Sequence, residues 1–258
     1  MTDRGEVRYL YVPIFPGQFR IAVPPAIASR LRAASAIEQW SLVNAVVMLG
    51  ATGMALWFAV LWPLLGVGCA SLLGLILVAR EEWTPSGRFG WANRTTALRL
   101  GALGLLPFVP ADATWTFVAL GLGVLIADGV DGWLARRLDL TSEFGEFFDK
   151  ETDTLFLVLL CVLTAFRGAL PVWIVGLGIL RYVFVITLFA LQPHASKEER
   201  SSMAQYIYVS VVVALLAAFL PYPSVYQPLV LVATGALLYS FGRDFVWIVR
   251  LRLGTLEA

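Results

Sequence analysis

Apolar runs recur along the whole chain, and they restrict its fold more than any other feature. Of the 258 residues, 59% are hydrophobic, and the mean hydropathy is +0.78. A helix of about 20 apolar residues crosses the roughly 30 Å of hydrocarbon in a bilayer. Within lipid only helices and closed barrels satisfy their backbone hydrogen bonds, and these runs are too long and too uniformly apolar for barrel strands. The sequence therefore predicts an all-α integral membrane protein, a polytopic helical bundle.

Turn-forming residues divide the apolar sequence into separate candidate spans. Prolines and glycines mark the breaks, for example at Trp62-Pro63, at Arg167-Gly168 and at Pro221-Tyr222-Pro223. We predict eight spans, at residues 41–60, 63–79, 93–109, 113–133, 149–166, 169–191, 203–220 and 225–242.

The two ends of the chain are less apolar than the spans. Residues 1–40 contain four prolines with interspersed arginines, and we expect neither a signal peptide nor a span there. Within this N-terminal cytoplasmic or interfacial segment, residues 26–40 predict a short amphipathic helix at the membrane surface. A plain solvated lead-in is the alternative. Residues 243–253 alternate basic and apolar side chains and could form another surface helix.

Charge and cysteine content exclude some classes of protein. The net charge is +1 and no basic tract is present, which argues against a nucleic-acid partner. Cys69 and Cys161 both lie inside apolar runs, so neither a disulfide nor a metal pair is expected.

The basic residues predict how the spans are oriented. If the loop after Asp131 is cytoplasmic and the spans alternate, all of the 19 Lys and Arg residues except Arg167 and Arg181 fall on the cytoplasmic side. Such an excess is typical of cytoplasmic loops and helix ends. We therefore expect both termini and the loop after Asp131 in the cytoplasm, with the chain in the inner or cell membrane of a bacterium or archaeon.

Four aspartates, Asp128, Asp131, Asp149 and Asp153, form the most informative motif. The first two are spaced i, i+3 and the last two i, i+4, so each pair would share one face of a helix. Carboxylates beside lipid are costly, and a divalent cation offsets their mutual repulsion. Hard oxygen ligands favour Mg²⁺ or Mn²⁺, ions that also bind substrate phosphates.

The surrounding residues extend this motif to D-x-x-D-G-x-x-A-R, eight residues, G-x-x-x-D-x-x-x-D. Its remaining fixed positions are filled by Gly132, Ala135, Arg136 and Gly145. This pattern resembles the signature of the CDP-alcohol phosphotransferase family. The resemblance implies a six-helix catalytic membrane domain at residues 88–253, preceded by two additional transmembrane helices at residues 41–87.

The resemblance also implies a reaction and a division of roles. A CDP-linked lipid such as CDP-diacylglycerol would donate its phosphatidyl group to a small alcohol and release CMP, in phospholipid biosynthesis. The four aspartates would hold two ions of Mg²⁺ or Mn²⁺, and Asp153 would also be the general base. Gly132, Ala135, Arg136 and Gly145 would lie against the nucleotide or CDP-lipid. Family members are often homodimers.

A second resemblance concerns the start of the predicted core. Asn93, Thr96 and Arg99 match an Asn-x-x-Thr-x-x-Arg arrangement that in the family opens the first core helix beside the nucleotide. They are therefore candidate nucleotide-binding residues. Capping of the helix that follows would equally explain Asn93.

Basic residues define a candidate pocket for the acceptor or its phosphate: Arg137, Arg181, Lys197 and Arg200. Arg181 falls in the middle of a span, where a guanidinium requires a charged partner, and a substrate phosphate would suit it. Pairing with a backbone carbonyl, or snorkelling, is the alternative. The acceptor stays open among glycerol 3-phosphate, inositol phosphate, serine, choline and other alcohols.

Other acids near the motif are expected to be solvated or to cap helices: Asp139, Glu143, Glu146 and Glu151. Two other classes of protein remain as alternatives. A transporter or channel could use the acids and Arg181 along a permeation path, but its acids would lie near mid-membrane on several spans. A non-catalytic scaffold would have no use for the complete acid pattern.

Overall fold

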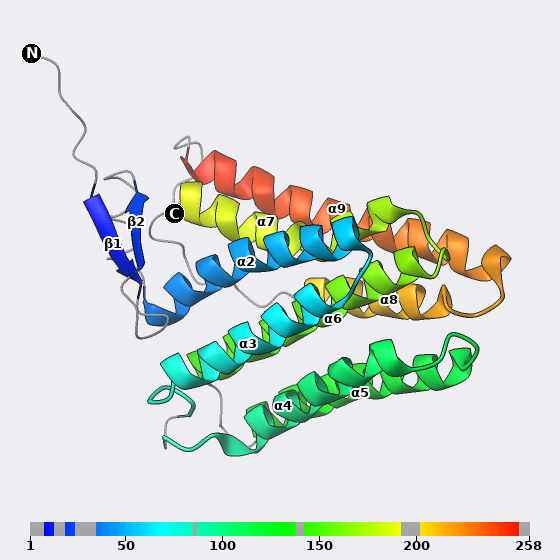
Figure 1. Cartoon of the computed structure of the whole chain (residues 1–258), viewed down its shortest axis with the longest axis horizontal. Coiled ribbons are helices and arrows are strands. Elements are labelled where there is room, and N and C mark those ends of the chain that lie inside the picture. Colours follow the sequence, from blue (N-terminus) through cyan, green and yellow to red (C-terminus); the bar gives the residue numbers. More distant parts are fainter. Residues whose placement is uncertain are drawn as a thin grey trace, which may run out of the picture.

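The computed structural model describes residues 8–12, 19–23, 35–84, 87–137, 142–191 and 202–252; the side chains of 8–23, 130–137, 202, 247, 248 and 250–252 lie outside this description. Within these residues, eight α-helices follow a small β-hairpin (Figure 1). The helices are α2 (Ala36–Phe58), α3 (Trp62–Val78), α4 (Gly90–Leu105), α5 (Thr114–Arg137), α6 (Glu143–Phe166), α7 (Val175–Leu191), α8 (Ser202–Ala217) and α9 (Pro223–Arg252). Each predicted span corresponds to one of them, which confirms the predicted fold class.

The ends of several helices differ from the predicted bounds, for local reasons. The helix α6 begins at Glu143, because the Ser142 side chain caps it by accepting a hydrogen bond from the Gly145 backbone at 3.0 Å. The last helix, α9, runs unbroken to Arg252, so the predicted separate surface helix continues the last span instead.

The N-terminal region contains a feature that the sequence did not indicate. Strands β1 (Arg8–Val12) and β2 (Phe19–Val23) pair antiparallel, with Arg8 opposite Val23. Of the amphipathic helix predicted at residues 26–40, residues 26–34 lie outside the described part of the chain. The helix α2 begins at Ala36, where Ser35 and Glu38 form a capping box with hydrogen bonds of 3.2 and 2.8 Å.

The centre of the bundle is α6. It packs against α2, α3, α4, α7 and α8, and its residues are buried along most of their length (Figure 1). Close approach of α7 depends on Gly178, where an added Cβ would lie 2.8 Å from the Cα of Val158 on α6. Small residues at such contacts are typical of helix pairs in membranes, where backbones approach closely.

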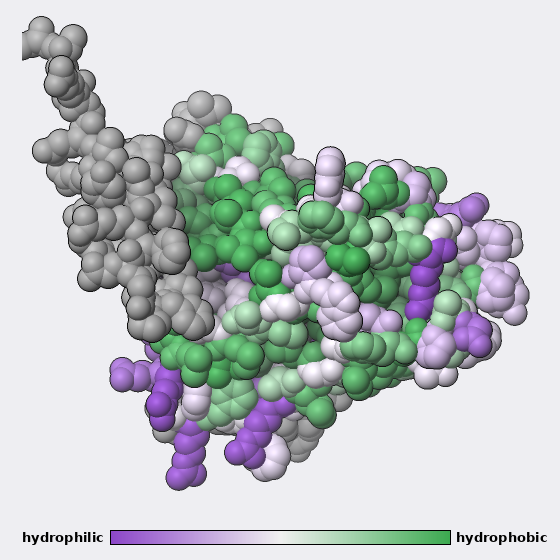
Figure 2. Space-filling view, in the orientation of Figure 1, coloured by the Kyte–Doolittle hydropathy of each residue, from purple (hydrophilic) through white to green (hydrophobic). Residues whose placement is uncertain are grey.

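The outer surface of the bundle is suited to a bilayer. Among the described residues, three helical stretches are long and apolar enough to cross a membrane: Ala36–Phe58, Val172–Leu191 and Pro223–Val246. Shorter apolar stretches are Trp62–Val78, Thr114–Gly129 and Met203–Ala217. Figure 2 shows hydrophobic side chains over the body of the molecule, with most hydrophilic ones toward its two ends.

Exposed aromatic side chains mark the end of the bundle where α2 ends and α3 begins. They lie at the ends of helices and in the connections between them: Trp57, Phe58, Trp62, Phe108, Trp115, Trp173 and Tyr222. Aromatic residues are enriched where a membrane protein meets the lipid headgroups. This belt, the three apolar spans and the eight-helix architecture together define an integral membrane protein.

Candidate active site

Three of the four motif aspartates converge inside the bundle. Asp128 comes from α5, and Asp149 and Asp153 come from successive turns of α6. One carboxylate oxygen from each lies within 4.8 Å of the others. Asp128 and Asp149 are only 7% and 8% exposed, so little water screens their repulsion. The i, i+4 spacing thus places Asp149 and Asp153 on one face, as the sequence predicted.

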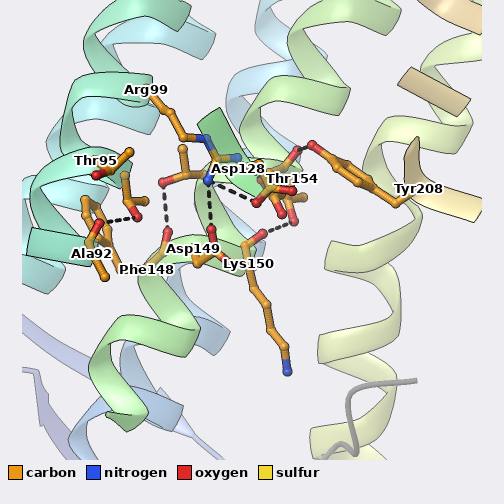
Figure 3. Close-up of polar contacts among 12 residues, drawn as sticks. Ala92, Thr95, Arg99, Asp128, Phe148, Asp149, Lys150, Thr154 and Tyr208 are labelled. Atoms are coloured by element: carbon orange, nitrogen blue, oxygen red, sulfur yellow. Dashed lines mark hydrogen bonds and ion pairs between the residues drawn. The ribbon is translucent and has the colours of Figure 1, made fainter. Parts of the chain in front are cut away.

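Arg99 lies among these three carboxylates, and Figure 3 shows it beside Asp128 and Asp149. Its guanidinium comes from α4, and the side chain is 1% exposed. One terminal nitrogen is 2.8 Å from Asp149 Oδ1 and 3.1 Å from Asp128 Oδ1, and the other donates to Asp153. The sequence predicted Arg99 as a nucleotide-binding residue, but it gave no sign that Arg99 contacts the acids. Arg99 therefore joins the three helices that form the site.

The charge of the described cluster is unbalanced. Three carboxylates contribute −3 and one guanidinium +1, which leaves −2. The donor set consists of carboxylate oxygens, the ligands that Mg²⁺ and Mn²⁺ prefer. Because these oxygens already lie close together, the residues fit a divalent cation, and binding it would offset the remaining negative charge.

A connected loop supports the edge of this site. The Trp83 carbonyl, after α3, accepts hydrogen bonds from the Asn93 side-chain amide at 3.0 Å and from the Ser142 hydroxyl at 2.8 Å. An added Cβ on Gly145 would lie 3.0 Å from Asn93 Oδ1, so this glycine permits the close contact of α4 and α6. These contacts join the α3–α4 connection to the start of α6.

The position of Asn93 corrects its predicted alternative role. Because α4 begins at Gly90, Asn93 lies inside the helix and does not cap it. Asn93 is buried, as is Thr96, whose hydroxyl donates to the Ala92 carbonyl at 3.2 Å. Both lie on the helix that carries Arg99, and their binding of nucleotide stays a prediction.

Tyr208 is a neighbour of the site that sequence reasoning missed. It reaches the cluster from α8, and its hydroxyl donates to the backbone carbonyl of Asp153 at 3.4 Å (Figure 3). A single tyrosine in an apolar run gives no sequence signal for such a place. Its position brings a fourth helix to the site.

Arg181 lies in a different polar cluster. Its guanidinium is 3.1 Å from Glu151 Oε1, and the Asn44 side-chain amide donates to Glu151 Oε2 at 2.8 Å. Glu151 is 2% exposed, so the prediction that it is solvated or a cap was wrong. The charged partner that the sequence required for Arg181 thus comes from the protein itself. A role for Arg181 in an acceptor pocket stays a prediction.

Other predicted site residues fall where the structure gives no side chains. The backbone of Asp131, Gly132, Ala135, Arg136 and Arg137 belongs to α5, but their side chains lie outside the described part. Lys197 and Arg200 are outside the described residues altogether. The roles of all seven stay predictions.

Comparison with known proteins identifies the class of protein that carries this site. The family model for CDP-alcohol phosphatidyltransferase matches residues 89–240, which include the acidic cluster and Arg99. The chain therefore belongs to the CDP-alcohol phosphatidyltransferase family, a family of membrane-embedded transferases of phospholipid biosynthesis, as its motif predicted.

Two curated relatives come from Arabidopsis thaliana. CDP-diacylglycerol–glycerol-3-phosphate 3-phosphatidyltransferase 1, chloroplastic/mitochondrial, is 29% identical over 103 residues, covering 37% of this chain and 34% of the relative. CDP-diacylglycerol–glycerol-3-phosphate 3-phosphatidyltransferase 2 is 34% identical over 94 residues, covering 31% of this chain and 40% of the relative. The chain thus matches less than half the length of either relative. No solved structure matches the chain.

Proposed function

We propose that this protein transfers a phosphatidyl group from a CDP-linked lipid, such as CDP-diacylglycerol, to an alcohol and releases CMP. The observation that carries this proposal is the convergence of Asp128, Asp149 and Asp153 within 4.8 Å, inside the segment that matches the family. Membership of that family supports the enzyme over the transporter or channel alternative.

The reaction is a displacement at phosphorus. The acceptor hydroxyl attacks the phosphorus next to the diacylglycerol, a new P–O bond forms, and the P–O bond to CMP breaks. Such transfers depend mainly on positioning and on stabilisation of negative charge. The acceptor proton goes to the Asp153 carboxylate, which is the only one of the three described aspartates more than slightly exposed, with 19% of its side chain accessible.

Asp128, Asp131, Asp149 and Asp153 are the residues that would hold Mg²⁺ or Mn²⁺, in two ions if the carboxylates bridge. When bound, the ions would neutralise the diphosphate and stabilise the entering and leaving oxygens. Arg99 supplies a fixed positive charge between the same carboxylates, and it holds them together before substrate binds.

The nucleotide would lie beside Gly132, Ala135, Arg136 and Gly145, near Asn93, Thr96 and Arg99. Glycine permits close approach of a ligand to the backbone, and arginine matches the geometry of a diphosphate. Arg137, Arg181, Lys197 and Arg200 remain candidates for the acceptor phosphate. Glycerol 3-phosphate is the first acceptor to test, because both curated relatives carry it in their names.

The site would face the cytoplasm. By the helix bounds, several described basic residues lie at the same end of the bundle as the start of α6: Arg80, Arg88, Arg94 and Arg243. The aromatic belt and Arg167, at the end of α6, lie at the other end. Cysteine labelling at position 143 and of a C-terminal tag in oriented vesicles should therefore come from one face. Labelling from opposite faces would contradict the eight-span topology.

The direct test of the reaction is CMP release by the purified protein. CDP-diacylglycerol is offered with glycerol 3-phosphate, inositol phosphate, serine and choline in parallel. We expect CMP with one acceptor, and loss of that CMP in Asp149→Asn. Asp112→Asn, an exposed acid in the α4–α5 connection, is the matched control and should retain activity. No CMP with any acceptor would contradict the proposal.

A further inference from the structure

The central helix α6 carries two polar faces in the same two turns. Successive residues of an α-helix are rotated by about 100°, so residues two apart point to nearly opposite sides. Asp149 and Asp153 therefore face Arg99, whereas Glu151 between them faces α2 and α7. Any rotation of α6 moves both faces together.

The face with Glu151 is tied to three other helices. Glu151 Oε1 lies 3.1 Å from Arg181 on α7, and Glu151 Oε2 accepts from Asn44 on α2 at 2.8 Å. Asn44 Oδ1 in turn accepts from the Ser71 hydroxyl on α3 at 2.6 Å. The Glu151 side chain is 1% exposed, and Asn44 is 3% exposed. The two helices before the family-matched segment thus reach the catalytic helix through a buried hydrogen-bonded network.

Further along α6 the contacts with its neighbours are of a different kind. From Leu155 to Leu163 its buried side chains are all apolar, so its orientation there depends on close packing such as the contact of Val158 with Gly178. Hydrogen bonds and ion pairs prescribe a direction, because they weaken steeply when the donor is misaligned. Buried ionic groups are in some proteins retained because they specify one arrangement rather than because they add stability.

We propose that Glu151 is a positioning residue, whose contacts with Arg181 and Asn44 hold α6 at the rotation that aims Asp149 and Asp153 toward Asp128 and Arg99. The helices α2 and α3 then support the active site, although they lie outside the family-matched segment at residues 89–240. This inference rests on the proposed function in that it takes the acidic cluster to be a cation site.

Manganese binding provides the first test. The electron paramagnetic resonance signal of free Mn²⁺ falls as the purified protein binds the ion, which gives a dissociation constant without any turnover. Residues that orient ligands without touching the metal are typically worth 10- to 100-fold in affinity, so Glu151→Gln should weaken Mn²⁺ binding by about tenfold or more. Asn44→Leu, which leaves Glu151 and Arg181 in place, should weaken binding by a smaller factor.

Two further variants separate positioning from loss of folding. Thr164→Val removes another buried polar group of α6, whose hydroxyl bonds only within its own helix to the Cys161 carbonyl at 2.9 Å, and it should leave Mn²⁺ affinity within about twofold. The double variant Glu151→Leu with Arg181→Met replaces the ion pair by apolar groups of similar size, an exchange that often preserves stability. It should stay folded and melt above the Glu151→Leu single variant, although the Asn44 amide loses its acceptor, and it should still bind Mn²⁺ about tenfold more weakly.

A distance between two spin labels tests the positioning role of Glu151 without any metal. Nitroxide labels at positions 98 on α4 and 143 on α6, both exposed, are placed in a background with Cys69 and Cys161 replaced by alanine. Glu151→Gln should shift or broaden the distance distribution, and Thr164→Val should not. If the wild-type protein binds no Mn²⁺, the metal part of the proposed function is wrong. The label distances alone then test whether Glu151 positions α6. An unchanged distribution, or an Mn²⁺ affinity equal to that of Thr164→Val, overturns the positioning role.

Discussion

Two buried polar clusters lie on opposite sides of α6, and they differ in charge balance. On one side, Asp128, Asp149 and Asp153 surround the single guanidinium of Arg99, which leaves −2 among the described side chains. On the other side, Glu151 faces Arg181 and sums to zero. Both clusters are buried, and both join helices that are distant in sequence.

The difference indicates what each cluster does. An ion pair buried between helices suits a role in fixing their arrangement. Several carboxylates close together in a poorly screened place are stabilised by added positive charge, which a divalent cation can supply. The number of carboxylates that converge, three against one among the described side chains, therefore distinguishes the candidate catalytic face of α6 from its supporting face.

The largest expected effect comes from Asp153→Asn on the unbalanced face. Loss of a general base typically lowers turnover by about 10²- to 10⁴-fold, whereas CDP-lipid binding should largely persist. CMP release and CDP-lipid affinity are measured on the same preparation. An equal fall in both would show that Asp153 acts first as a metal ligand.

Arg99→Gln should sharpen the charge comparison. Removing one partner of a buried ion pair costs about 3 to 5 kcal/mol, because three neighbouring carboxylates then lose their guanidinium. Divalent cations should restore much of this loss, since they supply the missing positive charge. Thermal unfolding with and without Mn²⁺ measures it, with exposed Arg94→Gln on the same helix as the control. A loss that Mn²⁺ leaves untouched would contradict a cation site beside Arg99.

Gly178→Ala tests the packing behind the balanced face. Its new Cβ would lie 2.8 Å from the Val158 backbone, so α7 must move away from α6. We expect a loss of about 1 to 3 kcal/mol in the free energy of unfolding. Gly176→Ala, on the same helix with no atom within 4 Å of the added Cβ, is the matched control. Equal stability of the two variants would argue against the close α6–α7 contact.

The smallest effect should come from Lys150, between the two faces. Its ammonium group points away from the acidic cluster in Figure 3 and lies 3.1 Å from Glu146 Oε1, with side chains 21% and 41% exposed. Partly exposed pairs at i, i+4 contribute about 0.3 to 0.5 kcal/mol. Lys150→Gln should therefore change the melting temperature little and leave turnover intact. A raised KM for a phosphorylated acceptor would instead assign Lys150 to the acceptor pocket.

The sequence predicted the features that depend on local periodicity. Apolar runs between prolines and glycines located the eight helices of the described residues, and the i, i+4 spacing placed Asp149 and Asp153 on one face. The same helical periodicity also predicts a feature that the sequence analysis did not use. Glu151 lies two residues from both Asp149 and Asp153, so it must point to the opposite side of α6, which is buried on all sides. A buried acid at that position requires a positively charged partner, and Arg181 had already been identified as a basic residue in the middle of a span.

Contacts between residues that are distant in sequence could not be predicted from periodicity. The contact of Asn44 with Glu151 joins residues 107 apart in sequence, and that of Arg99 with Asp153 joins residues 54 apart. Periodicity fixes which face of a helix a residue occupies, but it does not fix which helix packs there. For the same reason Tyr208 and the N-terminal hairpin gave no usable signal.

The central claim is that the unbalanced cluster binds the divalent cation that phosphatidyl transfer requires. CMP release from CDP-diacylglycerol is measured after exhaustive chelation, and again after Mg²⁺ or Mn²⁺ is added back, for the wild-type protein and for Asp128→Asn and Asp149→Asn. We predict that chelation abolishes CMP release, that either ion restores it in the wild-type protein, and that neither ion restores it fully in the variants. Undiminished CMP release after chelation, together with full activity of both variants, would contradict the claim.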